Sequence, residues 1–339
     1  MIFYALVLSL ALATKQIFSE KNISFSNSSC IKRLTLSEGS DSLPEEIKIL
    51  RLLQSSQVVQ ILNTTADASF FYVEMERCDM DFFDVIERFN FLPERVARIY
   101  LAELIVGLEF MHSKEIIHGD LKSENILLSR NGRLKIADFG LSCTFDSASS
   151  RIGTLSCTAP EIFQGEKVSA QSDWWAFAVL AYELCTGQDA FSVDDIFSQS
   201  TSRSSSERSD NDSCSSSCTD FSDEGVSSFV EVGDQSLESE EYVEVNRDPI
   251  FDAIKNLILE YDIVYPAMKP ALSLALKDFL SKFFVPIGQR NFPVRDHEWL
   301  VCINFDAFKN SDFQGPISIV DSDGEYHILE DACENFEHE

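Results

Sequence analysis

The chain has 339 residues and is 45% hydrophobic, which is enough for one large domain with a substantial core. Its net charge of −29 disfavours nucleic acid as a partner, because phosphate groups would be repelled, and favours basic peptides or basic proteins. The nine cysteines are an odd number without a C-x-x-C pair, which argues against a disulfide framework and against a zinc site.

The negative charge is concentrated in two segments. Residues 192–246 hold 14 Asp or Glu and two Arg, and residues 311–339 hold nine Asp or Glu and no Lys or Arg, which leaves −8 for the other 255 residues. The first segment has 17 serines and few large apolar residues, so we predict a disordered acidic insert there and an acidic C-terminal tail at 311–339. Serines of the insert that precede an acidic residue by three positions could be phosphorylated by an acid-directed kinase, with a solvated spacer as the alternative; among them are Ser204, Ser209, Ser217 and Ser228.

The chain begins with an apolar segment, residues 2–13, that allows more than one interpretation. It suits a pair of strands, but Ala11-Leu12-Ala13 also resembles a signal-peptidase site. Its 12 residues are fewer than the roughly 20 that span a bilayer, and no longer apolar segment follows, so we expect no membrane contact. Reduced cysteines predict a cytoplasmic or nuclear protein, with the secretory pathway as the alternative if residues 1–13 are a signal peptide.

Hydrophobic periodicity predicts several elements along the chain. Residues 45–53 read E-E-I-K-I-L-R-L-L, the pattern of an amphipathic helix, and residues 70–76 read F-F-Y-V-E-M-E, the pattern of a strand. Another helix is expected near residues 250–259. A long core helix is predicted within residues 93–112, where apolar residues recur at helical spacing: Val96, Ile99, Leu101, Leu104, Ile105 and Leu108.

Three short blocks carry residues suited to phosphoryl transfer. They are H-G-D-L-K-S-E-N at residues 118–125, D-F-G at 138–140 and A-P-E at 159–161. Asp120 could accept the proton of an attacking alcohol, and Lys122 could neutralise the transferred phosphoryl group. Asn125 and Asp138 supply a neutral and a charged oxygen, the hard ligands that Mg²⁺ prefers.

These blocks, in this order, resemble the signature set of the protein kinases, and the resemblance extends over about residues 6–310. The pair Trp174-Trp175 and the stretch W-L-V-C-I-N-F-D-A-F from Trp299 resemble the AGC group, with the ribosomal S6 kinase-like branch as a possible subgroup, and Lys122 is typical of serine/threonine kinases. The resemblance implies an α+β two-lobed fold, with a β-rich small lobe at 1–77 that is incomplete at its start and a mainly helical large lobe at 78–310. It also implies ATP and Mg²⁺ as cofactors and protein substrates.

The resemblance assigns a role to each candidate residue. Asp120 and Lys122 would be catalytic, and Asn125 and Asp138 would bind Mg²⁺. Glu46 would pair with a strand lysine that holds the α- and β-phosphates, for which Lys21 is the best candidate and Lys15 the alternative. Adenine would be bound by the backbone of Glu76 and Cys78, beside the gatekeeper Met75 and above Leu127. Two scaffold contacts are also implied: Asp173, in a buried helix from Ser172, with the catalytic-loop backbone, and Arg290 with Glu161.

The sequence departs from the kinase pattern in three places. The glycine-rich loop is expected 15–22 residues before Lys21, yet residues 1–6 contain no glycine, and side chains hinder close backbone approach to phosphates. Gly119 replaces the arginine that usually receives the activation-loop phosphate, so switching by a phosphate at Ser150 is predicted to be weak or absent. The tail lacks the F-x-x-F motif, with Phe313 and Phe336 isolated in the sequence. Two hypotheses remain, an active serine/threonine kinase and a pseudokinase that serves as a binding scaffold; the intact residues in the three blocks favour the enzyme.

Overall fold

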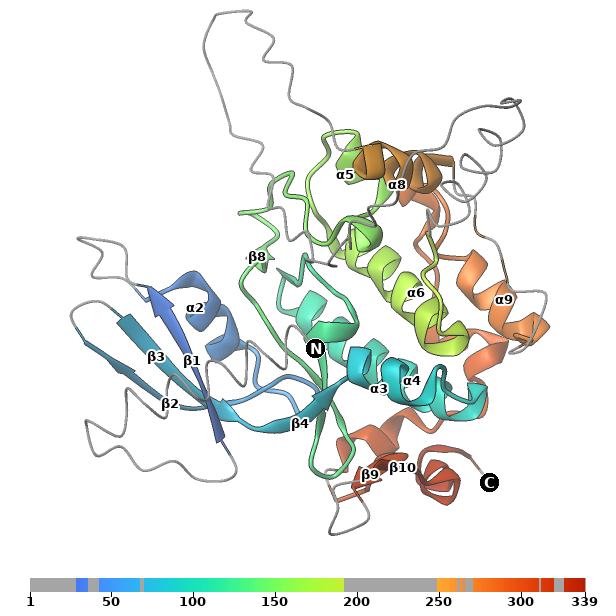
Figure 1. Ribbon diagram of the computed structural model, residues 1–339, viewed down its shortest axis with the longest axis horizontal. Helices are drawn as coiled ribbons and strands as arrows, with labels where there is room; N and C mark the ends of the chain where they lie inside the picture. The colour runs from blue at the N-terminus through green and yellow to red at the C-terminus, as the bar shows by residue number, and fades with distance from the viewer. Residues whose placement is uncertain are drawn as a thin grey trace, which may run out of the picture.

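The computed structural model describes residues 29–35, 43–67, 70–191, 249–260, 263, 265, 271–310, 312–319 and 326–338. These residues form a small β-rich lobe and a larger, mainly helical lobe (Figure 1), which confirms the predicted α+β two-lobed kinase fold. The apolar segment 2–13 and the insert 192–246 lie outside the described residues, so the predictions for both stay predictions.

Within the described residues, the small lobe consists of a three-stranded antiparallel sheet and one helix. Strands β1 (Ser29–Thr35), β2 (Ile61–Ala66) and β3 (Phe70–Glu76) are arranged in the order β1-β3-β2, and helix α2 (Glu45–Leu52) follows β1 in the chain. The predicted amphipathic helix and strand are therefore confirmed. Acidic residues in the first turn of α2 and Arg51 in its last turn match the helix dipole. Its buried Ile47 packs against Phe71 and Val73 of the sheet, which holds α2 beside the strands.

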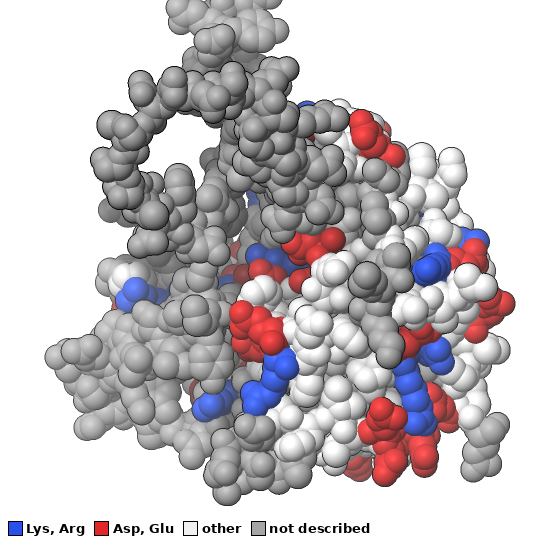
Figure 2. Space-filling view, turned by 45° about the vertical axis from the view of Figure 1, so that its right-hand side comes forward, with Lys and Arg blue, Asp and Glu red and all other residues white. Residues whose placement is uncertain are grey.

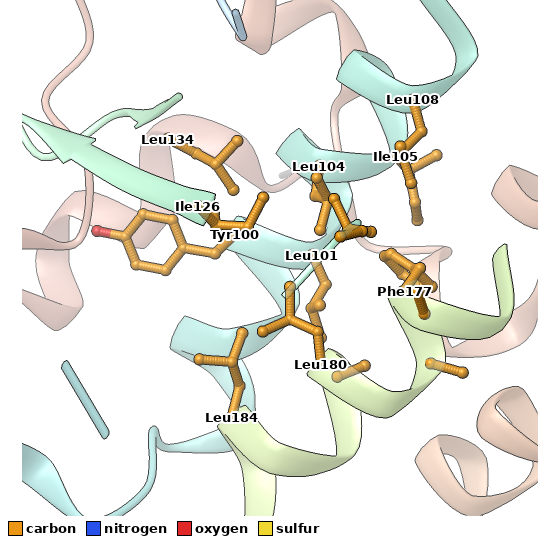
Figure 3. Packing of buried hydrophobic residues seen from close by; sticks show 14 of the residues in the cluster. Tyr100, Leu101, Leu104, Ile105, Leu108, Ile126, Leu134, Phe177, Leu180 and Leu184 are labelled. Carbon is orange, nitrogen blue, oxygen red and sulfur yellow. The ribbon is translucent and has the colours of Figure 1, made fainter. Parts of the chain in front are cut away.

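The large lobe is built around two long buried helices, α4 (Glu94–Ser113) and α6 (Ala170–Thr186). Figure 3 shows their apolar side chains meeting face to face, with Ile126 and Leu134 of the neighbouring strands on one side. Most residues of α6 are buried, and the buried residues lie on every face of the helix, as expected for a helix in the centre of a core. A capping box between Ser169 and Ser172 begins α6, and Gly187 ends it in the left-handed conformation (φ 69°).

Short strands carry the loops of the site. Strand β4 (Cys78–Asp81) leads into α3 (Phe82–Phe89) and forms a sheet in the order β4-β6-β7 with β6 (Ile126–Ser129) and β7 (Leu134–Ile136). Strand β5 (Ile116–Ile117) pairs with β8 (Cys143–Thr144). The other helices in the described part of the chain are α5 (Pro160–Phe163), α8 (Pro249–Glu260) and α9 (Leu274–Ser281). The same residues include seven short 3-10 turns, at Ser123–Asn125, Leu155–Cys157, Ile287–Gln289, Val294–Asp296, Glu298–Leu300, Phe305–Lys309 and Glu330–Phe336.

The acidic tail packs into the large lobe. Its hairpin, β9 (Ile317–Ile319) and β10 (Tyr326–Ile328), lies below α3 and α4 in Figure 1. The N–H of Ile317 donates to the hydroxyl of Tyr100 in α4 at 2.8 Å, and Phe336 is fully buried. Phe336 stacks on Phe308 with ring centroids 5.1 Å apart and contacts Phe313 at 6.0 Å. The two phenylalanines that are isolated in the sequence are thus joined in one aromatic cluster. Glu337 then binds Arg95 of α4 at 2.7 Å and ties the end of the tail to the lobe.

Surface charge on the described residues is mixed. Figure 2 shows acidic and basic side chains lying next to one another on this face, consistent with the small net charge of the chain outside its two acidic segments. Among the helices that the structure describes, none combines the length and the apolar character needed to cross a bilayer.

Candidate active site

The catalytic loop is held by a buried aspartate of α6. Asp173 accepts hydrogen bonds from the backbone N–H groups of His118 (2.9 Å) and Gly119 (3.0 Å), as predicted, and its Oδ2 lies 2.9 Å from Nε2 of His112. Burial alone would raise the pKa of Asp173, but the hydrogen bond and charge of His112 outweigh it and hold that pKa below its ordinary value. The loop therefore rests on a fixed negative charge within the core.

Gly119 has a conformational reason to be glycine. Its φ of +79° lies in the left-handed region, and an added Cβ would approach the carbonyl oxygen of Leu141 to 3.0 Å. Gly119 stands in place of the phosphate-receiving arginine, and it also avoids the backbone strain that a residue with a side chain would cause in this loop. The activation segment is held at this point by neutral contacts instead: Ser142 Oγ donates to the carbonyl of His118 at 2.9 Å, and Val168 N–H donates to that of Ser149 at 3.1 Å.

The two carboxylate oxygens of Asp120 differ: one is bound by two short hydrogen bonds, and the other is more open. Its Oδ1 accepts from the backbone N–H and the hydroxyl of Thr154, both at 2.8 Å, while Oδ2 has a longer contact with Asn125 Nδ2 at 3.3 Å. Lys122 Nζ lies 3.8 Å from Oδ2. Gly153 makes this approach possible, since a Cβ there would come within 2.7 Å of Asp120 Oδ1. The structure thus brings the two predicted catalytic side chains together beside the activation segment.

The lysine that pairs with Glu46 is Lys32, which replaces Lys21 in that predicted role. Lys32 Nζ lies 2.6 Å from Glu46 Oε1 and 2.8 Å from Asp138 Oδ1, whereas Lys21 lies outside the described residues. The antiparallel register of β1 on β3 places Lys32 opposite Val73, next to α2. The sequence did contain a signal: Ile31-Lys32 matches the end of the V-A-I-K pattern, 14 residues before Glu46.

The charges of this trio stabilise one another. Burial lowers the pKa of Lys32, but Asp138 and Glu46 outweigh it and raise that pKa; burial likewise raises the pKa of Asp138, but Lys32 outweighs it and lowers it. Both groups are therefore charged at neutral pH. Asp138 also has φ +58°, a strained conformation for a residue with a side chain, and such strain is found mostly at functional sites.

The residues present fit a magnesium ion. Asn125 is 1% exposed, its Nδ2 donates to the backbone carbonyl of Asp120 at 2.8 Å, and its Oδ1 has no hydrogen-bond partner among the described residues. A buried oxygen without a donor is costly unless a cation binds it. With the carboxylate of Asp138, it supplies the two oxygen ligands that the sequence predicted.

β3 ends at Glu76 and β4 begins at Cys78, so the two residues predicted to bind adenine through their backbone lie at the junction of these strands. Lys135 Nζ and the backbone N–H of Gln60 both bind Glu76 Oε1, at 2.8 Å and 2.9 Å, so the side chain of Glu76 is fixed. Cys78 begins β4, and Leu127, half-buried, lies on the adjacent strand β6. The proposed adenine contacts of Glu76, Cys78 and Leu127 stay predictions.

Sequence reasoning missed a set of acidic side chains beside the catalytic loop. Glu183 of α6 accepts from Ser123 Oγ at 3.3 Å, and burial, with further contributions from Asp189 and Glu124, raises its pKa to about 8. Asp81, whose side chain caps the N-terminus of α3, has its pKa raised to about 7, chiefly by burial. A signal for Glu183 was available, because it is a charged residue within an otherwise apolar stretch of α6.

The buried scaffold pair is also as predicted. Both terminal nitrogens of Arg290 bind the carboxylate of Glu161, at 2.6 Å and 2.8 Å, and both side chains are almost fully buried. Arg290 also donates to the carbonyl oxygens of Val285 and Gln171. This pair fixes the end of the activation segment to the last part of the large lobe.

Comparison with known proteins agrees with this geometry. Residues 5–231, about two thirds of the chain, match the model of the protein kinase domain. The chain is 44% identical over 136 residues to protein kinase C delta type of Mus musculus, covering 39% of this chain and 20% of that protein. It is 34% identical over 149 residues to cAMP-dependent protein kinase type 3 of Saccharomyces cerevisiae (43% and 37%), and 35% over 173 residues to the probable serine/threonine-protein kinase CCRP1 of Zea mays (49% and 28%). The chain thus spans well under half the length of each of these relatives. The matched domain, which covers about two thirds of the chain, establishes that the chain belongs to the protein kinase family.

Proposed function

We propose that this chain is an active serine/threonine kinase that transfers the γ-phosphate of ATP to a protein hydroxyl. The observation that carries the proposal is the joint placement of two groups: Lys32 with Glu46 and Asp138, and Asp120 with Lys122 and Asn125. A binding scaffold that transfers no phosphate has no chemical need for both of these groups of residues.

Asp120 has the geometry of a base for the substrate hydroxyl. Thr154 occupies Oδ1 with two hydrogen bonds, which fixes the plane of the carboxylate and leaves Oδ2 to accept the hydroxyl proton. Lys122 Nζ, 3.8 Å from Oδ2, would stabilise the negative charge of the transferred phosphoryl group. Orientation and charge stabilisation, rather than covalent chemistry, are what phosphoryl transfer needs from a protein.

Lys32, Asn125 and Asp138 would position the nucleotide. Lys32, held by Glu46, would bind phosphate oxygens, and Asn125 with Asp138 would hold Mg²⁺. When bound, the ion neutralises charge on the phosphate oxygens. Because Lys32 now bridges to Asp138, nucleotide and metal binding would replace that contact.

The acidic set beside the catalytic loop supports basic substrates. Glu124, Glu183 and Asp189 interact electrostatically, and Asp81 lies near Glu124. A pKa of about 8 means that Glu183 is largely protonated at pH 7, so a lysine or arginine of the substrate would gain most from it above pH 8. We therefore expect KM for a basic peptide to fall as the pH rises from 7 to 9.

The test is phosphate transfer from Mg·ATP to a library of basic serine/threonine peptides. Asp120→Ala should lower the rate by about 10²- to 10⁴-fold, the usual contribution of a general base. Asp146→Ala is the matched control. Asp146 is an exposed carboxylate of the activation segment, and it makes no contact with Asp120 in the described residues. Equal transfer by the wild type and Asp120→Ala would refute the proposal.

A pseudokinase scaffold is the second candidate, favoured by one observation. Residues 10–17, which lie 15–22 residues before Lys32, contain no glycine that could form a phosphate-binding loop. Thermal denaturation with and without Mg·ATP separates the candidates, since a ligand at 100 times its Kd stabilises the folded state by about 2.7 kcal/mol. No shift with Mg·ATP, together with no transfer, would favour the scaffold.

A further inference from the structure

A small cavity adjoins Asp120 on the side of the activation segment. Its walls come from the catalytic loop, from the segment between Arg151 and Ala159, and from helices α5 and α6. About 20 Å³ is open to the centre of a water molecule, which is room for one or two waters. The cavity is partly open to solvent, so a side chain of a bound peptide can reach its mouth.

Arg151 is a charged residue of this cavity whose guanidinium has no ion-pair partner among the described residues. It lines the cavity and is exposed, and the described residues offer it neither an ion pair nor a hydrogen bond. Of the two carboxylates in the same lining, Asp173 is bound by His112 and two backbone N–H groups. Asp120 is bound by Thr154 through Oδ1, and its more open Oδ2 is the oxygen assigned to the substrate hydroxyl. A guanidinium without a partner is available to a carboxylate of the substrate.

The position of the cavity identifies which part of the substrate it meets. A hydroxyl that gives its proton to Asp120 must lie about 2.6–3.2 Å from the carboxylate. The next residue of the substrate has its Cα only about 3.8 Å farther along the chain. Because Asp120 itself lines the cavity, a residue directly beside the acceptor lies at the cavity mouth, next to Arg151.

We propose that Arg151 selects substrates with an acidic residue directly beside the phosphorylated serine or threonine. The inference rests on the proposed kinase function and refines its substrate class. The acidic set around Glu183 would bind basic residues elsewhere in the same peptide, so the preferred substrate would carry a carboxylate next to its acceptor and basic residues farther away. Because the cavity has room for only about one or two water molecules, a large aromatic side chain does not fit inside it.

Binding of peptides that cannot be phosphorylated tests the inference without relying on transfer. The peptides carry basic residues and alanine in place of the acceptor, with Glu directly after it, Glu directly before it, or Leu at both positions. Their Kd values are measured by fluorescence anisotropy on the wild type, Arg151→Ala, Arg151→Glu and the control Arg130→Ala, which removes an exposed arginine from the turn between β6 and β7.

We expect one of the two Glu peptides to bind the wild type and Arg130→Ala about three- to fivefold more tightly than the Leu peptide, the usual size of an exposed ion pair. Arg151→Ala should abolish this preference, and Arg151→Glu should make the Glu peptide the weaker ligand. Equal Kd values for all three peptides on the wild type, or a preference that survives in Arg151→Ala, would overturn the inference. Transfer to the matching serine peptides, run beside Asp120→Ala, separately tests the kinase function itself.

Discussion

Replacing Lys32 by methionine removes the charge that holds Glu46 and Asp138 together while keeping most of the side-chain length. In the structure Lys32 Nζ makes ion pairs at 2.6 Å and 2.8 Å, and the side chain is 32% exposed. Because we propose that Lys32 binds the phosphates of the nucleotide, this substitution should remove that contact and release Glu46, whose side chain is only 10% exposed.

The size of the effect follows from these contacts. A hydrogen bond to a charged group contributes about 1.5–3 kcal/mol, and partial exposure reduces the value for Lys32. Loss of the phosphate contact and of the Glu46 anchor together should therefore cost about 3 kcal/mol in the transition state. Since about 1.4 kcal/mol changes a rate tenfold, we expect kcat/KM to fall by about 10²-fold.

The assay is steady-state transfer of phosphate to a basic peptide, with two further variants. Lys48→Met removes a charge from the same helix as Glu46, where Lys48 pairs with Glu45 at 2.9 Å on the surface, and should change the rate little. Lys21→Met tests the residue that the sequence pattern favoured. A rate for Lys32→Met close to the wild type, or a large loss in Lys21→Met alone, would show that the assignment of Lys32 is wrong.

Four further predictions concern stability and regulation. Glu161→Ala leaves Arg290 buried without its carboxylate partner and should lower the free energy of unfolding by about 3–5 kcal/mol. Lys309→Ala breaks the exposed pair with Asp306 and should lower it by less than about 1 kcal/mol. Equal effects of the two variants in urea denaturation would contradict this prediction. Phe336→Ala should cost about 3–5 kcal/mol because Phe336 is fully buried, and an unchanged melting temperature would show that the tail is not part of the core. The pKa of Glu183 is raised to about 8 in the folded state, so the folded state binds more protons than the unfolded state and stability falls as the pH rises from about 5 to 8. Glu183→Gln should weaken this fall. Identical profiles of melting temperature against pH for the wild type and the variant would refute the prediction. Ser150→Ala and Ser150→Glu should both retain wild-type transfer, since Gly119 offers no arginine to a phosphate, and a large loss in Ser150→Ala would reveal a phosphate switch.

The two parts of the site differed in how far they could be predicted. Asp120, Lys122 and Asn125 lie within six residues of one loop, so their relation is local, and the structure brings them together as the spacing suggested. The strand lysine is different, because several lysines precede Glu46 and their spacing alone does not choose among them. The register of β1 on β3 decides in favour of Lys32, and that register depends on packing against α2.

The sequence by itself determined the family, the large-lobe helices and the chemistry of the catalytic loop, because these depend on periodicity and on residues close together in the chain. It also indicated the pairs of Asp173 with the catalytic loop and of Arg290 with Glu161, through the resemblance. Only the tertiary structure decided which groups from distant segments meet: Lys32 with Asp138, Ser123 with Glu183, and Phe336 with Phe308. Their contacts arise from strand register and from the packing of whole helices against one another, and neither quantity is written in any local stretch of residues.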